Sequence, residues 1–456
     1  MPALSTRIPT VPALAVAALL IAVAACGDNG SAPVPIDTQL RQALAQANVT
    51  PLTALPAQPP ALVTLGQALM FDKILSGNKD ISCGTCHRPL AHTGDTLTLS
   101  IGTGGTGLGA GRMLGTSRVF IARNAPELFN RGYSQFTQMF WDGRVSGTPG
   151  SFVTPAGALL PPGLNSALAA QAMFPVTNRD EMRGQVGDLD VNGAPNELAD
   201  SADNNLPGIW AAIMARLLNI PAYVTLFDAA YPGLPHTFEQ AANAIAAFEI
   251  AGFTRINSPF DQYLAGANSA LTDAEKRGAL TFYGRGLCSR CHSGSHLTNQ
   301  QFSNIGVPQL GPGRPPGAPL DFGRENPTGV GADRYKFKTP PLRNVELTAP
   351  DMHDGAYATL EAAVRHYKHL PMAQQRYDST QADARLLNTP NGYHNSAGTV
   401  AEVTATLDAR IASDIDFTDT EINEMVAFLE ALTDPTARDL STELPATVPS
   451  GLPVDR

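Results

Sequence analysis

Two stretches of the chain carry the same arrangement of cysteine and histidine. The sequence reads Cys-Gly-Thr-Cys-His at 83–87 and Cys-Ser-Arg-Cys-His at 288–292. In a C-x-x-C-H motif each thiol can add to one vinyl group of a haem, and the histidine can reach the iron as its proximal ligand. The pattern predicts two covalently attached c-type haems. Their attachment residues and proximal iron ligands would be Cys83, Cys86 and His87, and Cys288, Cys291 and His292.

Other chemistries use paired cysteines. The chain has five cysteines, and four remain when Cys26 near the N-terminus is set aside. An exported protein with four cysteines often forms two disulfides, and a thioredoxin-type redox pair also has the spacing C-x-x-C. A zinc site built from four cysteines uses pairs at this spacing as well. Here the pairs lie about 200 residues apart and each carries its own histidine, which neither a redox pair nor a zinc site requires. Haem attachment is therefore the favoured interpretation.

Composition limits the class of protein. The chain has 456 residues, of which 43% are hydrophobic and 16% charged, as expected of a folded protein with room for two domains. There are 31 Lys and Arg against 41 Asp and Glu, a net charge of −10. This balance leaves no basic surface on the scale that nucleic-acid binding needs.

The N-terminus resembles an export signal. Residues 1–25 contain one basic side chain, Arg7, and no acidic one, and an apolar, alanine-rich run covers 11–25. The run is short for a membrane span, so it predicts a signal peptide. It ends in Val-Ala-Ala-Cys at 23–26, which resembles a bacterial lipobox and predicts a periplasmic protein held at a membrane by a lipid on Cys26. An ordinary signal peptide with a chance cysteine is the alternative. Residues 26–60 are polar and rich in Pro and Ala, which predicts a tether.

The elements that must position the two motifs have a helical pattern. Capping boxes at Thr237, Thr272 and Thr418 predict helix starts, and alternating runs long enough for a sheet are absent. We therefore expect an all-α fold with two cytochrome c-like haem domains and long loops. The expected domains are an N-terminal one at 61–258, a C-terminal one at 259–440 and a tail at 441–456. The glycine-rich stretch 102–111 lacks the flanking strand, helix and lysine of a phosphate loop and predicts a loop only.

Several further motifs, in the same order, resemble those of bacterial dihaem cytochrome c peroxidases and the related MauG-type enzymes. The resemblance covers about residues 60 to 435. The motifs that carry it are Leu-Gly-Gln-Ala-Leu-Met-Phe-Asp at 65–72, Leu-Ser-Gly-Asn at 75–78, Arg-Asn-Ala-Pro at 123–126, Phe-Trp-Asp-Gly-Arg at 140–144, Glu-Met at 181–182, Pro-Leu-Arg-Asn-Val at 341–345, Thr-Ala-Pro at 348–350 and His-Asp-Gly at 353–355.

The resemblance implies roles for individual residues. Peroxide would react at the N-terminal haem, ligated by His87, and the C-terminal haem, ligated by His292, would receive or hold electrons. Glu181 would be the distal acid-base residue, accompanied by Gln171. Without the motif, Glu181 would be interpreted as a solvated loop carboxylate. Trp141 would relay electrons between the haems, whereas Trp210 lies in an apolar segment typical of a core.

The resemblance also implies a calcium ion at the domain interface. Asn124, Thr348 and Pro350 match positions that supply oxygen atoms to calcium in relatives, two of them through backbone carbonyls. Oxygen ligands suit calcium. With few carboxylates, such a site would retain several waters.

The chain departs from the typical peroxidase at the first haem. There a histidine that follows Ser-Ile-Gly caps the iron until the other haem is reduced, but this chain has Thr103 at that position. Threonine is a poor ligand for haem iron, so the resemblance implies an open distal side without reductive activation. His92 is the nearby substitute.

A second departure concerns the ligand of the C-terminal haem. The typical methionine is replaced by Tyr367, as in MauG-type enzymes. Helical spacing independently puts Tyr367 on the apolar face of 360–370, with His366 and His369 turned away. A tyrosinate ligand stabilises ferric iron and lowers the potential, so this haem would store oxidising equivalents. Met372 or His369 is the alternative ligand.

We therefore expect a peroxidase that reduces hydrogen peroxide. Electrons would come from a small cytochrome or copper protein, or from an oxidisable side chain of a partner protein, which is the MauG-like variant. The alternative is a dihaem electron-transfer cytochrome without catalysis, in which both irons are six-coordinate. Glu181 and the threonine at 103 count against that alternative.

Overall fold

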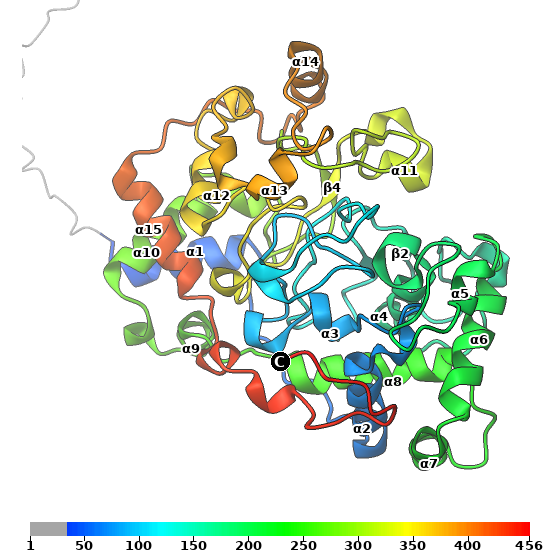
Figure 1. The fold of residues 1–456 in the computed structure, drawn as a ribbon. Helices are drawn as coiled ribbons and strands as arrows, with labels where there is room; N and C mark the ends of the chain where they lie inside the picture. The colour runs from blue at the N-terminus through cyan, green and yellow to red at the C-terminus, as the bar shows by residue number, and fades with distance from the viewer. Residues whose placement is uncertain (1–33) are drawn as a thin grey trace, which may run out of the picture. The chain divides into compact units, whose positions relative to one another are not determined.

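Helices joined by long loops make up the computed structural model, which describes residues 34–456 (Figure 1). The predicted signal peptide, 1–25, and Cys26 lie outside the described residues. The unit considered below is Ile36–Arg456. Its helices are α1 Ile36–Gln46, α2 Pro60–Phe71, α3 Cys83–Cys86, α4 Ala167–Ala172, α5 Glu197–Asp200, α6 Leu206–Leu218, α7 Pro221–Ala230, α8 Phe238–Phe253, α9 Pro259–Leu264, α10 Asp273–Tyr283, α11 Glu325–Thr328, α12 Leu360–His366, α13 Ala384–Leu387, α14 Ala397–Ala405 and α15 Asp419–Glu430.

Strands play a minor part in the described residues. β1 (Gln138–Met139) pairs antiparallel with β2 (Val145–Ser146), and β3 (Phe302–Ser303) pairs antiparallel with β4 (Phe337–Lys338). Each strand has two residues, so the pairs hold loops together and form no layer. The expected all-α fold class is confirmed, since the helical structure also matches dihaem peroxidase folds over most of the chain.

The first hydrophobic core forms around α2, α4 and α8 and supports the first cysteine motif. Gly66 of α2 lies so close to the backbone of α8 that a Cβ there would come within 1.9 Å of the Ala244 carbonyl oxygen. Glycine therefore lets these two helices touch. Phe71 at the end of α2 packs edge-on against Phe248 of α8, with ring centroids 5.7 Å apart.

The second core joins α1, α9, α10, α12 and α15 and supports the second cysteine motif. Gly278 of α10 lies against the backbone of α15, where a Cβ would come within 1.8 Å of the Glu424 carbonyl oxygen. Phe428 of α15 packs edge-on against Phe260 and Phe282, with centroids 5.4 Å away in both contacts. A third cluster mixes both halves of the chain, because Leu97 and Leu99 pack with Val307 and Leu310.

The three predicted capping boxes are confirmed. Thr237, Thr272 and Thr418 are the N-caps of α8, α10 and α15, each paired with the predicted Gln or Glu three residues later. Trp210 is a core residue, as expected, since it is 4% exposed and donates from Nε1 to the Met173 carbonyl over 2.8 Å.

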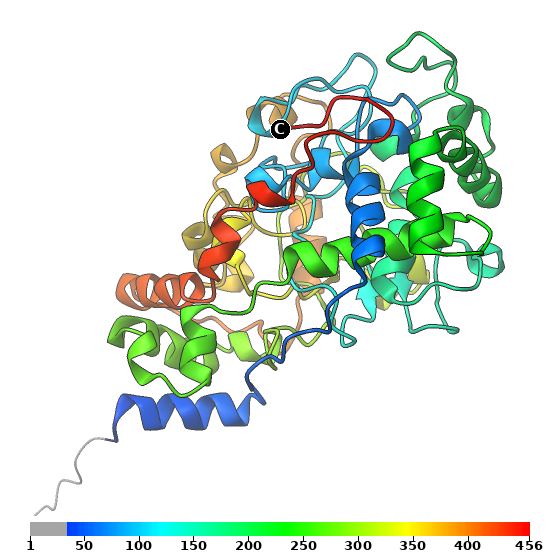
Figure 2. The same ribbon diagram turned by 90° about the horizontal axis from the view of Figure 1, so that it is seen from below.

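The predicted tether at 26–60 does not describe residues 36–46, which form α1. Leu40 and Leu44 of α1 are buried in the second core, and Asp37 pairs with Lys276 of α10 at 3.0 Å. Figures 1 and 2 both show α1 beside α10. The sequence did not predict this helix because the segment is mostly polar and only one of its faces is apolar.

The tail after residue 440 is also packed. Ser450 donates from its hydroxyl to Asp72 over 2.6 Å, and the Asp455 carboxylate lies 2.6 Å from the Lys73 ammonium. Val448 lies within the first core. Among the described residues, no single helix has the length and apolar character to cross a membrane, although α6 and α7 together meet that test as a pair bent by 107°.

Two candidate haem sites

The first cysteine motif lines a cavity whose wall also contains residues of α4 and of the loops that follow α3. Cys83 and Cys86 lie on the single turn of α3, whose start is stabilised by a hydrogen bond from the Ser82 N–H to the Thr85 hydroxyl over 2.9 Å. The ring nitrogen Nδ1 of His87 lies 3.1 Å from the Thr93 carbonyl oxygen. Burial lowers the pKa of His87, so the ring is neutral, which is the form that binds a metal.

The second motif lines a separate cavity between α12, α15 and the loop after α10. Cys288 and Cys291 flank a turn of 3₁₀ helix, and Nδ1 of His292 lies 3.0 Å from the Leu297 carbonyl oxygen. Burial lowers the pKa of His292 to about 4. Both histidines thus have the same arrangement: a buried, neutral ring whose Nδ1 lies close to a backbone carbonyl a few residues later in the chain.

These two cavities fit haem groups. Each cavity is lined by both cysteines and the histidine of one motif, and the atom-free space, counted out into the solvent at the openings, is about 1380 Å³ in the first and about 1460 Å³ in the second. The four cysteines are free, and burial raises the pKa of the Cys83 and Cys288 thiols to about 12. No cluster of three or more Cys, His, Asp or Glu suited to a metal ion occurs in the described part of the chain, so the alternative of a zinc site receives no support.

Glu181 lies in the wall of the first cavity together with Gln171 of α4. It belongs to one turn of π-helix, Arg179–Arg183, whose N-cap Asn178 accepts from the Glu181 N–H and donates from Nδ2 to Oε1 of Glu181 over 3.2 Å. Burial raises the pKa of Glu181, and the nearby Arg144 and Arg314 only partly oppose this. Glu181 is therefore a cavity residue and not a solvated loop carboxylate.

Trp141 lines both cavities. Its Nε1 donates to the Asn124 carbonyl oxygen over 3.0 Å, and its own carbonyl accepts from the Lys338 N–H over 2.8 Å. The motif position predicted for a relay thus lies between the two sites.

Neither Thr103, which stands at the position of the capping histidine, nor His92, the substitute ligand, lines the first cavity. The Thr103 hydroxyl donates to Asp80 over 2.7 Å, and its N–H donates to the Glu181 carbonyl over 2.9 Å. Nδ1 of His92 lies 3.2 Å from the Ala437 carbonyl oxygen, and His92 does not line the cavity.

Tyr367 follows α12 and lines the second cavity with Leu360, Ala363 and Val364. Burial raises the pKa of its phenol. His366 is turned away, as expected, because its Nε2 lies 2.7 Å from the Ile305 carbonyl oxygen. The alternative ligands also lie elsewhere: His369 contacts Asp414, and the Met372 side chain is 56% exposed.

Asn124, suggested as a calcium ligand, bonds to the part of the chain that carries the other two suggested ligands, Thr348 and Pro350. The Asn124 N–H donates to the His353 carbonyl over 2.9 Å, which brings Asn124 to the segment after Thr348 and Pro350. The side-chain amide of Asn124 donates to the Leu97 carbonyl over 2.8 Å.

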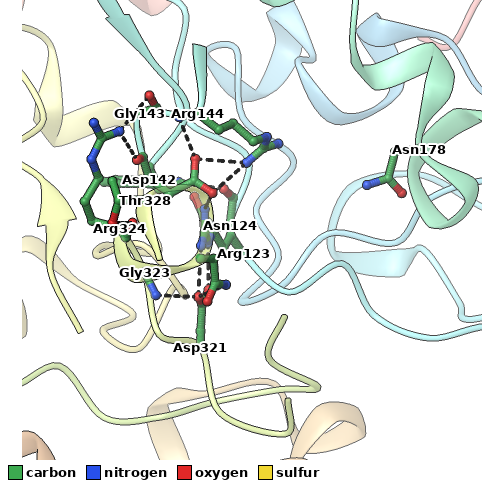
Figure 3. Close-up of polar contacts among 12 residues, drawn as sticks. Arg123, Asn124, Asp142, Gly143, Arg144, Asn178, Asp321, Gly323, Arg324 and Thr328 are labelled. Carbon is green, nitrogen blue, oxygen red and sulfur yellow. Dashed lines mark hydrogen bonds and ion pairs between the residues drawn. The ribbon is translucent and has the colours of Figure 1, made fainter. Parts of the chain in front are cut away.

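The sequence reasoning missed a charged network beside the first cavity, drawn in Figure 3. Arg123 donates to both carboxylate oxygens of Asp321, over 2.6 and 2.9 Å, and also lies 2.7 Å from Asp142. Arg324 donates to the carbonyls of Asp142 and Gly143, each over 2.8 Å. Arg123 and Asp142 belong to the motifs at 123–126 and 140–144, so the resemblance to the family could have pointed to these two residues.

A buried lysine was also missed. Lys338 of β4 lines both cavities, and its ammonium donates to the Gln138 carbonyl over 2.9 Å. Burial lowers the pKa of Lys338 to about 7. No local pattern marks this lysine in the sequence.

Comparisons with known proteins agree with this geometry. The family described as di-haem cytochrome c peroxidase matches residues 60–269. The methylamine utilization protein MauG of Methylorubrum extorquens is 31% identical over 312 residues, which cover 68% of this chain and 69% of that protein. Cytochrome c551 peroxidase of Pseudomonas aeruginosa is 32% identical over 310 residues, covering 66% of this chain and 69% of that protein.

Solved structures give the same result. The crystal structure of a MauG-like protein associated with microbial copper homeostasis is 26% identical with a TM-score of 0.59, and the match covers 87% of this chain and 96% of that one. The diheme peroxidase BthA from Burkholderia thailandensis, at 20% identity and a TM-score of 0.59, shares the fold over 90% of this chain and 93% of its own. The chain therefore belongs to the dihaem cytochrome c peroxidase and MauG family, and it is an oxidoreductase that carries two c-type haems and acts on peroxide.

Proposed function

We propose that hydrogen peroxide is reduced in the first cavity and that the second cavity holds the haem that receives and stores electrons. This assignment rests on the side chains that line the two cavities, which differ between them. Glu181 and Gln171 line the first cavity beside His87, whereas Tyr367 lines the second beside His292. A proton-transfer residue is needed where the O–O bond breaks, and a sixth ligand suits a haem that only transfers electrons.

Glu181 would move the proton. A haem held by Cys83, Cys86 and His87 would supply the iron centre and the electron transfer that peroxide reduction needs. The Glu181 carboxylate takes a proton from one peroxide oxygen and returns it to the other, which leaves as water; with two electrons and two protons in all, one peroxide gives two waters. Asn178 holds Oε1 of Glu181 in place. Gln171 would orient the peroxide by hydrogen bonding.

Trp141 would relay electrons between the two haems. A relay must be held rigidly between donor and acceptor, and the indole is fixed through its bond to Asn124 and lines both cavities. The electron donor would be a small cytochrome or copper protein, or an oxidisable side chain of a partner protein. Tyr367 as a ligand favours the MauG-like second case, because a tyrosinate stabilises the ferric state.

A calcium ion bound by Asn124, Thr348 and Pro350 is part of the proposal. The amide oxygen of Asn124 accepts no hydrogen bond from the described residues, which leaves it free for a cation. Elemental analysis of protein dialysed with and without a calcium chelator tests this. Calcium below one equivalent before chelation would exclude the site.

Periplasmic location and a lipid on Cys26 are also proposed, on the basis of the lipobox-like sequence at 23–26. Replacing Cys26 by Ser would release the protein from the membrane fraction, with export unchanged. Equal membrane association of the parent and the variant would contradict the anchor.

The main experiment uses the holoenzyme with both haems. Hydrogen peroxide is mixed with the ferric protein in a stopped-flow spectrometer, then with a reduced small cytochrome present. We expect a fast spectral change at the first haem and oxidation of two equivalents of cytochrome per peroxide. If peroxide changes the spectrum of neither haem, the protein is the non-catalytic electron-transfer cytochrome instead.

A further inference from the structure

The first cavity contains two arginines that the proton transfer above does not use. Arg144 directly precedes β2, and Arg314 lies in the loop after residue 310, in the other half of the chain. Both line the cavity that also holds His87 and Glu181. Both act electrostatically on Glu181.

Arg144 is fixed in position. Its guanidinium lies 3.2 Å from both carboxylate oxygens of Asp142 and sits over the Phe140 ring, 3.5 Å from the centroid. The same carboxylate also binds Arg123, which is held in turn by Asp321 (Figure 3). Asp142 is therefore shared between two guanidinium groups.

Arg314 has no such partner. Its guanidinium makes no hydrogen bond or ion pair with the described residues. The charge of Arg144, with burial and the charge of Arg123, lowers the pKa of Arg314 to about 10, so Arg314 is still positive at neutral pH. Asp142 and Glu181 are the carboxylates that act most on Arg314, and Asp142 is already shared.

The guanidinium groups of Arg144 and Arg314 line the same cavity, and two positive charges there repel each other unless a negative charge lies close by. While Glu181 is ionised, it supplies that charge. Once Glu181 is protonated, Asp142 is the remaining carboxylate that acts on both arginines, and its negative charge is already shared with Arg123. A small anion close to Arg144 and Arg314 would then balance their charge.

We propose that Arg144 and Arg314 form an anion-binding site for hydroperoxide, the anion that remains when hydrogen peroxide gives a proton to Glu181. In this step one O–H bond of the peroxide breaks, its proton forms an O–H bond on the Glu181 carboxylate, and the electron pair stays on oxygen. No electron is transferred. The negative charge passes from Glu181 to hydroperoxide while both lie near the same two arginines. This inference rests on the proposed reaction of peroxide in the first cavity.

The test uses the ferric holoenzyme with fluoride as an inert small anion and imidazole as a neutral ligand. Three variants are compared with the parent protein. Arg314→Met removes the charge and breaks no hydrogen bond, Arg314→Lys keeps a charge, and Arg376→Met removes an exposed guanidinium that donates to the Lys368 carbonyl outside the cavity. Dissociation constants come from optical titration, and haem content from the absorbance of the reduced protein.

We expect Arg314→Met to weaken fluoride binding by about 10- to 100-fold, the loss typical of a hydrogen bond to a charged group. The rate constant with peroxide should fall by a similar factor. Imidazole binding should stay the same in every variant. Arg314→Lys should recover part of the fluoride affinity, and Arg376→Met should match the parent in all measurements.

Two results would overturn the inference. One is unchanged fluoride affinity and peroxide rate in Arg314→Met with full haem content. The other is unchanged fluoride affinity with a shifted reduction potential of the first haem, which would mean that the arginines bind a carboxylate of the haem. A parent protein that ignores peroxide would instead refute the proposed function, and the fluoride titrations would still decide whether the pair binds anions.

Discussion

The indole nitrogen of Trp141 donates a hydrogen bond to the backbone carbonyl of Asn124 over 3.0 Å, in a position where the tryptophan lines both haem-sized cavities. Asn124 in turn donates from its N–H to the His353 carbonyl in the C-terminal half. One chain of hydrogen bonds therefore links the relay candidate to both halves of the protein. The orientation of this side chain depends on how the halves pack.

Replacing Trp141 by Phe should slow electron transfer between the haems. Phenylalanine keeps a ring in place but lacks the hydrogen bond to Asn124 and is harder to oxidise. Stopped-flow spectroscopy that follows the two haem spectra separately would measure the effect. Trp210→Phe is the matched control, since Trp210 is buried in the first core and lines neither cavity. Equal transfer rates in the two variants would remove Trp141 from the pathway.

Replacing Glu181 by Gln should slow the reaction with peroxide by about 10²- to 10⁴-fold, the usual contribution of a positioned acid-base group. Haem content and resting spectra should be unchanged because glutamine has the same shape. Asp180→Asn is the control, because this neighbouring carboxylate bonds to Gln185 and does not line the cavity. If both variants react at the parent rate, proton transfer uses another group.

The rate constant of the peroxide reaction should depend on pH through the protonation of Glu181. Only the carboxylate form can accept a proton, and burial raises the pKa of Glu181 above the ordinary ~4.3 of a glutamate. The carboxylate is fully present above this raised pKa and is lost as the pH falls through it. The rate constant should therefore decline on the acid side, at a higher pH than a solvated glutamate would give. A decline that persists in Glu181→Gln would assign it to a different group.

The ferric protein should have one high-spin haem that binds cyanide without prior reduction. Thr103 is bound to Asp80 and His92 faces Ala437, so neither caps the first cavity. Electron paramagnetic resonance of the oxidised protein, recorded with and without cyanide, measures this directly. Two low-spin signals that do not respond to cyanide would show that another side chain fills the sixth position.

Changing Tyr367 to His or Met should raise the reduction potential of the haem attached at Cys288 and Cys291. Each of these ligands favours the ferric state less than a tyrosinate does. Peroxide binding at the other haem should be unaffected. Tyr377→Phe provides the control, because its hydroxyl donates to the Ala356 carbonyl outside the second cavity. A redox titration in which the Tyr367 variants match the parent would show that Tyr367 is not the ligand.

Local chemistry is what could be predicted from the sequence. Each haem motif lies within five residues, so the spacing of its cysteines and histidine already specifies covalent attachment. The capping boxes were predictable for the same reason, since the bonding groups are three residues apart. Tyr367 could be placed on the inner face of its segment because helical periodicity decides which side chains share a face.

Long-range packing decided the rest. Helix α1 and the tail after residue 440 have polar sequences, and their folding becomes visible only in their contacts with distant residues such as Lys276 and Asp72. The presence of Arg314 in the same cavity wall as Arg144 and Glu181 has no local signal in the sequence, because it depends on a loop from one half of the chain reaching a cavity in the other half. A charge on a glycine- and proline-rich loop is normally solvated. The partial burial of Arg314 in a cavity that also contains Arg144 is a property of the tertiary structure alone.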